Sequence, residues 1–106
     1  MITTLNDFRV FEDYETKYAT AEIVIEQSFQ TFFANRLHRI TLNLRFDDHG
    51  FDIEENLIEY FNLPMNTHEQ PDSDDFLTQY QLKKVQQIPE VARLIEQFKE
   101  MALESA

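Results

Sequence analysis

Apolar and polar residues alternate over residues 39–46, and this alternation is the clearest secondary-structure signal in the chain. The two sets are Ile40, Leu42, Leu44 and Phe46 on one side, and Arg39, Thr41, Asn43 and Arg45 on the other. A period of two residues predicts a β-strand with one buried face.

Residues 47–50, Asp-Asp-His-Gly, indicate a tight turn after this strand, with Gly50 able to adopt positive φ. A return strand would place Phe51 opposite Phe46 and Asp52 opposite Arg45. The sequence thus predicts a short antiparallel β-hairpin over about residues 39–53. The alternative is that Asp52 caps a helix directly.

Helical spacing is present in the first part of the chain, although it competes with strand patterns. Thr4 and Asp7 resemble a capping box, and Leu5 and Phe8 are three residues apart, which suggests a helix opening near Thr4. The competing interpretation is a strand in which Phe8 and Val10 alternate with charged residues.

Residues 20–40 contain an apolar stripe at three- and four-residue steps, and the stripe predicts a helix for residues 26–37. Its members are Ile25, Phe29, Phe32, Phe33, Leu37 and Ile40. The β-branched residues 23–25 favour a strand instead, so residues 14–25 stay open between helix and strand.

The second half of the chain predicts further helices. The spacing of Ile53, Leu57, Tyr60 and Phe61 predicts a helix that ends before Pro64, and residues 64–72 form a polar loop. Asp72 or Ser73 then caps a helix with Phe76, Leu77, Tyr80 and Val85 at its core positions. A last helix begins at Pro89 and has the most regular stripe: Val91, Leu94, Ile95, Phe98, Met101 and Ala102.

These elements predict an α+β fold, a small helix-rich single domain formed by residues 1–106. It would contain the short antiparallel β-hairpin at about residues 39–53 and two C-terminal helices. With 42% hydrophobic residues, ten Phe and four Tyr, the chain has enough apolar surface for a core.

The charge distribution is strongly uneven. The net charge is −11, and residues 47–75 carry ten acids and no Lys or Arg. Such a segment attracts basic surfaces and repels nucleic acids and anionic membranes. Because Phe51, Ile53 and Leu57 are interleaved with the acids, we expect the segment to belong to the folded domain.

Motifs for catalysis, metals and cofactors are missing from the sequence. Asp47, Asp48, His49 and Asp52 have the composition of a metal site, but an EF-hand register around Gly50 fails, and a polar turn is the favoured interpretation. The three histidines have no zinc-binding spacing, and a single glycine cannot build phosphate-binding loops. We therefore predict no catalytic residue, no metal and no cofactor.

The chain contains no cysteine, no signal-peptide pattern and no run of 18 apolar residues, and we expect a cytoplasmic protein. Its function is predicted to be non-catalytic: inhibition of a basic nuclease or nucleic-acid-binding complex by electrostatic and steric occlusion. Nuclease-toxin immunity proteins and phage-type anti-nuclease or anti-CRISPR inhibitors are examples of that class. The residues predicted to bind this partner are Asp47, Asp48, Glu54, Glu55, Glu59, Asp72, Asp74 and Asp75.

The alternative is an assembly module or secretion-type chaperone, which forms a homodimer or binds cargo through the apolar face of the C-terminal helix. Direct binding to nucleic acid or to membranes is not expected for a chain with this charge.

Overall fold

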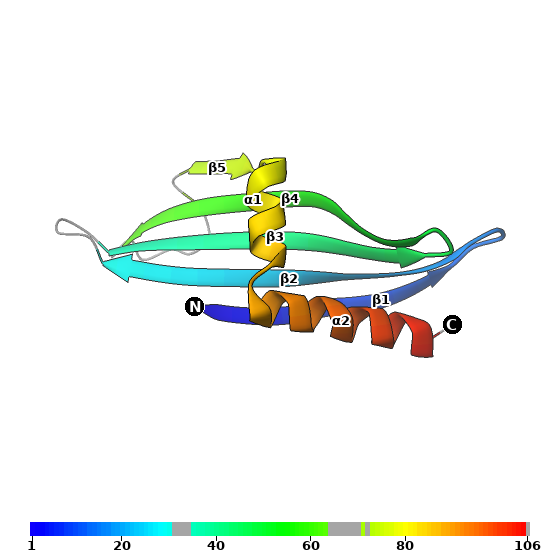
Figure 1. Cartoon of the computed structure of the whole chain (residues 1–106). Coiled ribbons are helices and arrows are strands. Elements are labelled where there is room, and N and C mark those ends of the chain that lie inside the picture. The colour runs from blue at the N-terminus through cyan, green and yellow to red at the C-terminus, as the bar shows by residue number, and fades with distance from the viewer. Residues whose placement is uncertain (31–34, 64–70, 72, 106) are drawn as a thin grey trace.

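The computed structural model describes residues 1–30, 35–63, 71 and 73–105 and contains one antiparallel sheet with two C-terminal helices (Figure 1). The strands follow each other in the order β1-β2-β3-β4-β5. Their bounds are β1 Ile2–Glu12, β2 Lys17–Gln30, β3 Asn35–Asp47, β4 Gly50–Leu63 and β5 Ser73–Phe76. The helices are α1 Gln79–Gln86 and α2 Pro89–Glu104. Because the strands are long, the molecule is elongated, with extents of 53 × 26 × 22 Å.

The helix-rich prediction was wrong, because the sheet dominates the fold. The helices predicted near Thr4, over residues 26–37 and after Ile53 are replaced by β1, by parts of β2 and β3, and by β4. The region that the sequence left open, residues 14–25, contains the start of β2. The predicted loop over residues 64–72, apart from Pro71, lies outside the described residues.

The predicted hairpin is present with its turn and register, but its strands are much longer than residues 39–53. Phe46 pairs with Phe51 and Arg45 with Asp52, as expected from the sequence. Gly50 has a φ of 104°, a conformation that side-chain-bearing residues rarely adopt.

Two β-bulges interrupt the regular alternation of side chains in β1 and β4, and the first explains a helix-like spacing. In β1 the register shifts between Asn6 and Arg9, and in β4 Glu55 has no partner on β3. An extra residue changes the two-residue spacing of side chains on one face to three. Leu5 and Phe8 therefore point to the same face of β1, although their spacing suits a helix.

Both helices lie on one face of the sheet and cover its apolar side chains (Figure 1). The buried strand residues come mainly from β2 and β3 and include Ile23, Ile25, Leu42 and Leu44. Phe98 of α2 is 0% exposed. Its ring meets Phe8 of β1 and Phe51 of β4 edge-on, at centroid distances of 6.1 and 6.2 Å. Phe98 thus packs α2 against β1 and β4, the two strands that flank β2 and β3.

The second of the two C-terminal helices was predicted more accurately than the first. Helix α2 begins at Pro89, and Val91, Leu94 and Ile95 on its predicted apolar stripe are buried. Helix α1 begins later than expected, because Thr78 forms a capping box with Gln81 and β5 occupies residues 73–76. Neither helix in the described part of the chain is long and apolar enough to cross a membrane.

We predict that Phe98→Ala lowers the free energy of unfolding by about 3 to 5 kcal/mol, because it leaves a cavity between α2 and the sheet. Urea denaturation followed by circular dichroism measures the change. Phe76→Ala is the matched control: that ring is 68% exposed, so its removal should change stability by no more than about 0.5 kcal/mol. A similar loss for both variants would contradict the packing described for α2.

Candidate functional site

The side of the sheet opposite the helices, here called the open face, is covered by neither α1 nor α2 (Figure 1). Side chains alternate between the two faces of each strand, so the pairing register decides which residues share the open face. The register arranges the open-face residues in cross-strand rows, and three of these rows contain candidate binding residues.

The first row, the hollow row, consists of Asn6, Glu22, Asn43 and Glu54, which are successive partners from β1 to β4. Both β-bulges lie beside this row: Asp7 follows Asn6, and Glu55 follows Glu54. Bulges bend and twist a sheet locally. An open hollow of about 620 Å³ lies between them.

The hollow is acidic. Its lining includes four carboxylates, on Asp7, Glu22, Glu54 and Glu55, and the guanidinium of Arg9. The formal charge of these five groups is −3 when all of them are ionised. The Asn43 side chain donates to the Glu55 carbonyl oxygen at 2.7 Å, which links β3 to the bulge in β4.

Two carboxylates in the hollow interact directly. Partial burial, a side-chain hydrogen bond with Asp7 and repulsion from its charge raise the pKa of Glu22, while Arg9 lowers it. Asp7 has a φ of 56°, in the left-handed region that aspartate tolerates better than most residues. The bulge that produces this backbone conformation therefore also brings the Asp7 carboxyl to Glu22.

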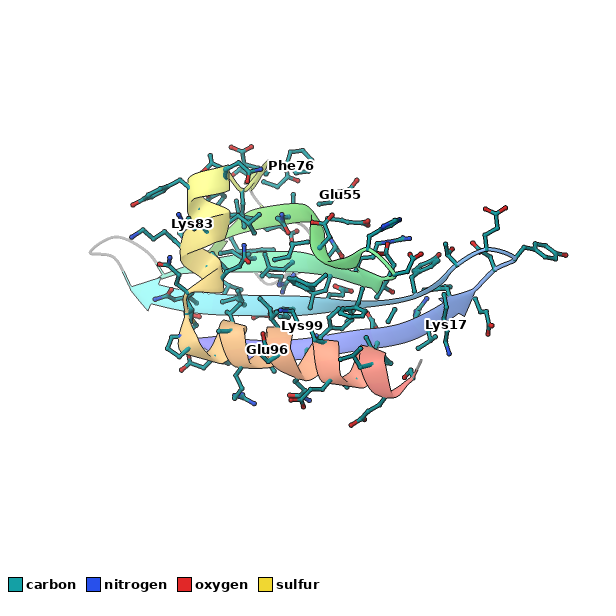
Figure 2. All side chains as sticks on the ribbon, turned by 45° about the vertical axis from the view of Figure 1, so that its right-hand side comes forward. Lys17, Glu55, Phe76, Lys83, Glu96 and Lys99 are labelled. Carbon is teal, nitrogen blue, oxygen red and sulfur yellow. The ribbon has the colours of Figure 1, made fainter. Side chains whose placement is uncertain are left out.

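The second row, the apolar row, lies next to the hollow and consists of Thr4, Val24, Thr41, Leu57 and Phe76. Val24 and Leu57 are half-buried, whereas Phe76 on β5 is 68% exposed. Figure 2 shows Phe76 and Glu55 on the β4–β5 side of the molecule, away from Glu96 and Lys99 on α2. The open face therefore offers an aromatic side chain at its β5 end.

The third row, the charged row, consists of Glu26, Arg39, Glu59 and Asp74, with the exposed Ile2 of β1 paired to Glu26 at its end. Arg39 bonds Glu26 at 3.4 Å, and its guanidinium lies 5.0 Å from the Phe61 ring centroid. Glu59 and Asp74 are direct cross-strand partners of like charge, an arrangement that is unfavourable in an isolated sheet. The acidic end of this row is therefore only partly neutralised within the chain.

Arg45 neutralises another part of the acidic segment. Its Nε lies 3.1 Å from Asp47 Oδ2 and 3.9 Å from Glu54 Oε1, and its guanidinium stacks 4.1 Å from the Tyr18 ring centroid. The hydrogen bond from Arg45, together with one from the His49 N–H, lowers the pKa of Asp47. The Asp47 carboxylate, at the end of β3, is therefore occupied by contacts with Arg45 and with the turn that follows.

The predicted partner-binding residues thus separate into groups. Glu54 and Glu55 line the hollow, and Glu59 pairs with Asp74 across β4 and β5. Asp75 is exposed on β5, where it accepts from the Phe76 N–H.

Asp47 and Asp48 lie at the far turn, where the exposed Asp48 carboxylate is 4.0 Å from His49 Nε2. Asp72 lies outside the described residues.

Sequence analysis missed Asp7 and Glu22, which come from β1 and β2 and complete the acidic hollow. The available signal was the alternation of Ala19, Ala21 and Ile23 with Thr20 and Glu22, which is typical of a strand that exposes Glu22. The position of Asp7 had no such signal, because it depends on the bulge in β1.

The described residues contain no group of three His, Asp or Glu side chains arranged to hold a metal ion. Asp47, Asp48, His49 and Asp52 instead form part of the turn and its flanking strands, as their favoured interpretation implied. The Asp52 carboxylate accepts from the N–H of Ile53.

Comparison of the chain with protein-family models, with curated protein sequences and with solved structures finds no significant match. The site is therefore interpreted from its own geometry.

We predict that Glu22→Gln raises the free energy of unfolding at pH 7. A folded-state pKa above the ordinary value means that ionised Glu22 opposes folding, and this cost disappears once pH falls below the ordinary pKa of 4.5. The stabilisation should therefore be present at neutral pH and absent near pH 3.5, as measured by urea titrations at the two pH values.

Glu100→Gln, at an exposed position on α2, is the control and should not show this pH dependence. Equal stabilisation by Glu22→Gln at both pH values would mean that its effect does not arise from the ionisation of Glu22 in its partly buried site beside Asp7.

Proposed function

We propose that this chain is a non-catalytic, acidic binding protein that occludes the basic surface of a nuclease or another nucleic-acid-binding protein. The open face carries the interaction. This proposal rests on one observation: carboxylates from four strands and an exposed aromatic ring share a face that neither helix covers.

The carboxylates of the open face are complementary in charge to a basic surface that binds the phosphates of a nucleic acid. Glu22, Glu54 and Glu55 lie on one side of the apolar row, and Glu59 and Asp74 lie on the other. Opposite charge steers association and favours basic partners over acidic ones. An inhibitor of this kind competes with nucleic acid for the same basic groups without any chemical step.

The apolar row adds a hydrophobic contact to the electrostatic attraction of the acidic residues. Aromatic side chains at the centre of an interface commonly contribute most of the binding energy, while charged residues around them fix orientation. Phe76 lies at the β5 end of the apolar row, between Glu59 and Asp74 on one side and the acidic hollow on the other, where charged residues flank an exposed aromatic ring. The chain contains no cysteine, which is compatible with action in the cytoplasm.

The alternative, a dimer or chaperone that uses the apolar face of the C-terminal helix, requires that face to be accessible. In this fold Val91, Leu94, Ile95, Phe98 and Ala102 of α2 are all buried in the chain's own core. The surface on which this alternative depends is therefore already occupied.

A charge-matched pair of variants tests the proposal. The open-face variant replaces five acids by their amides: Glu22→Gln, Glu54→Gln, Glu55→Gln, Glu59→Gln and Asp74→Asn. The control variant replaces five exposed acids elsewhere and reaches the same net charge: Glu12→Gln, Glu15→Gln, Glu90→Gln, Glu100→Gln and Glu104→Gln.

The immobilised wild-type chain should capture basic nucleic-acid-binding proteins from a lysate of its source cells, release them as salt rises, and reduce their DNA or RNA binding. We expect the open-face variant to retain at least tenfold less of each captured protein, and the control variant to behave as wild type. Equal capture by the two variants would show that net charge, and not the open face, mediates binding. Failure of the captured proteins to lose nucleic acid on adding the chain would contradict inhibition.

A further inference from the structure

The outer edge of β4 is only partly paired. In the described part of the chain, β5 pairs with residues 57–60 of β4, and Leu77 extends this ladder by donating its N–H to the Asn56 carbonyl at 3.0 Å. Figure 1 shows β5 beside one part of β4 only, while β4 continues beyond it towards the turn at Gly50. Within the described residues, no strand pairs with the outer side of residues 50–55.

The backbone of this segment has a hydrogen-bonding group directed away from β3. The Ile53 N–H donates to the Oδ1 atom of the preceding Asp52 at 2.9 Å and not to a neighbouring strand. Because backbone groups in an antiparallel strand alternate between its two edges, those of Phe51 face the same way as those of Ile53. The Asp52 carboxylate thus accepts a hydrogen bond from the Ile53 N–H, which would donate to an added strand.

The two sides of this edge differ in chemistry. On the helix side, an open groove of about 310 Å³ lies between β4 and α1 and is lined by Phe51, Asp52, Ile53, Gln79, Leu82 and Gln86. Phe51 and Ile53 are half-buried there, and the Lys99 ammonium lies 4.9 Å from the centroid of the Phe51 ring.

On the open side, the acids Asp52, Glu54 and Glu55 are exposed. A strand added at this edge would therefore direct alternate side chains towards the half-buried Phe51 and Ile53 and towards the exposed carboxylates.

We propose that the free edge of β4 at Phe51 and Ile53 binds an extended segment of a partner protein by antiparallel strand addition, next to β5. The segment alternates apolar and basic residues, with the apolar side chains packed on Phe51 and Ile53 at the helix side and the basic ones against Asp52, Glu54 and Glu55. This inference rests on the proposed function, since it specifies how a basic partner is recognised. Main-chain hydrogen bonds to β4 provide the affinity, and the alternating apolar and basic side chains provide the selectivity for this segment.

The charge of the edge selects the occupant. Acids and a bulge at an exposed strand normally prevent sheets from pairing with one another. Two copies of this chain, each with a net charge of −11, would bring the same acids together at this edge. A basic segment instead neutralises them, so the edge that excludes a second copy admits this partner.

Methylation of peptide nitrogens tests the proposal on the intact chain. The probe is the blocked heptapeptide Lys-Val-Lys-Val-Lys-Val-Lys, and its binding is followed by the amide NMR shifts of the isotope-labelled protein. In the proposed register the amides of the valines face β4 and those of the lysines face away. N-methylation of the three valines should weaken binding at least tenfold, whereas N-methylation of three lysines, with identical charge and mass, should weaken it less than threefold. The shifts should centre on Phe51 and Ile53.

A second measurement separates this inference from the proposed function. The double variant Asp52→Asn/Glu54→Gln should bind the unmethylated peptide at least fivefold more weakly, and Glu90→Gln/Glu100→Gln on α2 is its charge-matched control. If the two methylated peptides bind equally while the double variant still loses affinity, strand addition is overturned and electrostatic binding by the acidic face stands. Absence of any peptide binding, or shifts centred away from residues 50–56, would also overturn strand addition.

Discussion

The burial of Phe98 against one face of the sheet is the interaction on which the other parts of the structure depend. An antiparallel sheet whose apolar side chains lie mainly on one face must cover that face to be stable in water. Phe98 has no exposed surface, and it contacts β1 through Phe8 and β4 through Phe51. Because α2 satisfies this requirement on one side, the opposite side is left available for polar and charged residues.

The two β-bulges give the open face its shape. Without the extra residue in β1, the side chains beyond Asn6 would change faces, and Phe8 could not meet Phe98. The same extra residue is Asp7, whose carboxyl interacts with Glu22 across the sheet. Core packing and the acidic hollow thus depend on one irregularity in one strand. In β4, Glu55 occupies the corresponding position and lines the hollow from the other side.

The arginines of β3 set the balance of charge on the open face. Arg45 interacts with Asp47 and Glu54, and Arg39 interacts with Glu26, so the face is not uniformly negative. These pairs are exposed or half-buried, and such pairs usually stabilise a fold by less than about 1 kcal/mol. Their main consequence concerns recognition: within the part of the chain that the structure describes, the carboxylates of β4 and β5 with no arginine ion pair lie around the apolar row and along the outer edge.

The sequence by itself determined the features that local pattern controls. The alternation over residues 39–46 and the turn at Gly50 predicted the hairpin register, and the stripe from Val91 to Ala102 predicted α2, because neighbouring residues fix a turn and a helix face. It also determined that the negative charge is concentrated in residues 47–75. The sequence could not distinguish a bulged strand from a helix at Leu5–Phe8, since a bulge converts the spacing of two residues into three. At Ile53 and Leu57 it suggested one helix face, whereas in β4 these two side chains lie on opposite faces of the sheet.

Only the tertiary structure determined which acidic side chains lie close together. Asp7, Glu22 and Glu54 are far apart in the chain and become neighbours because β1, β2, β3 and β4 pair in order with bulges at two positions. The tertiary structure also decided that the apolar face of α2 is buried and that β5 leaves part of the β4 edge unpaired. Strand pairing is a non-local interaction, and its register depends on which face the helices cover, so no local stretch of the sequence contains that information.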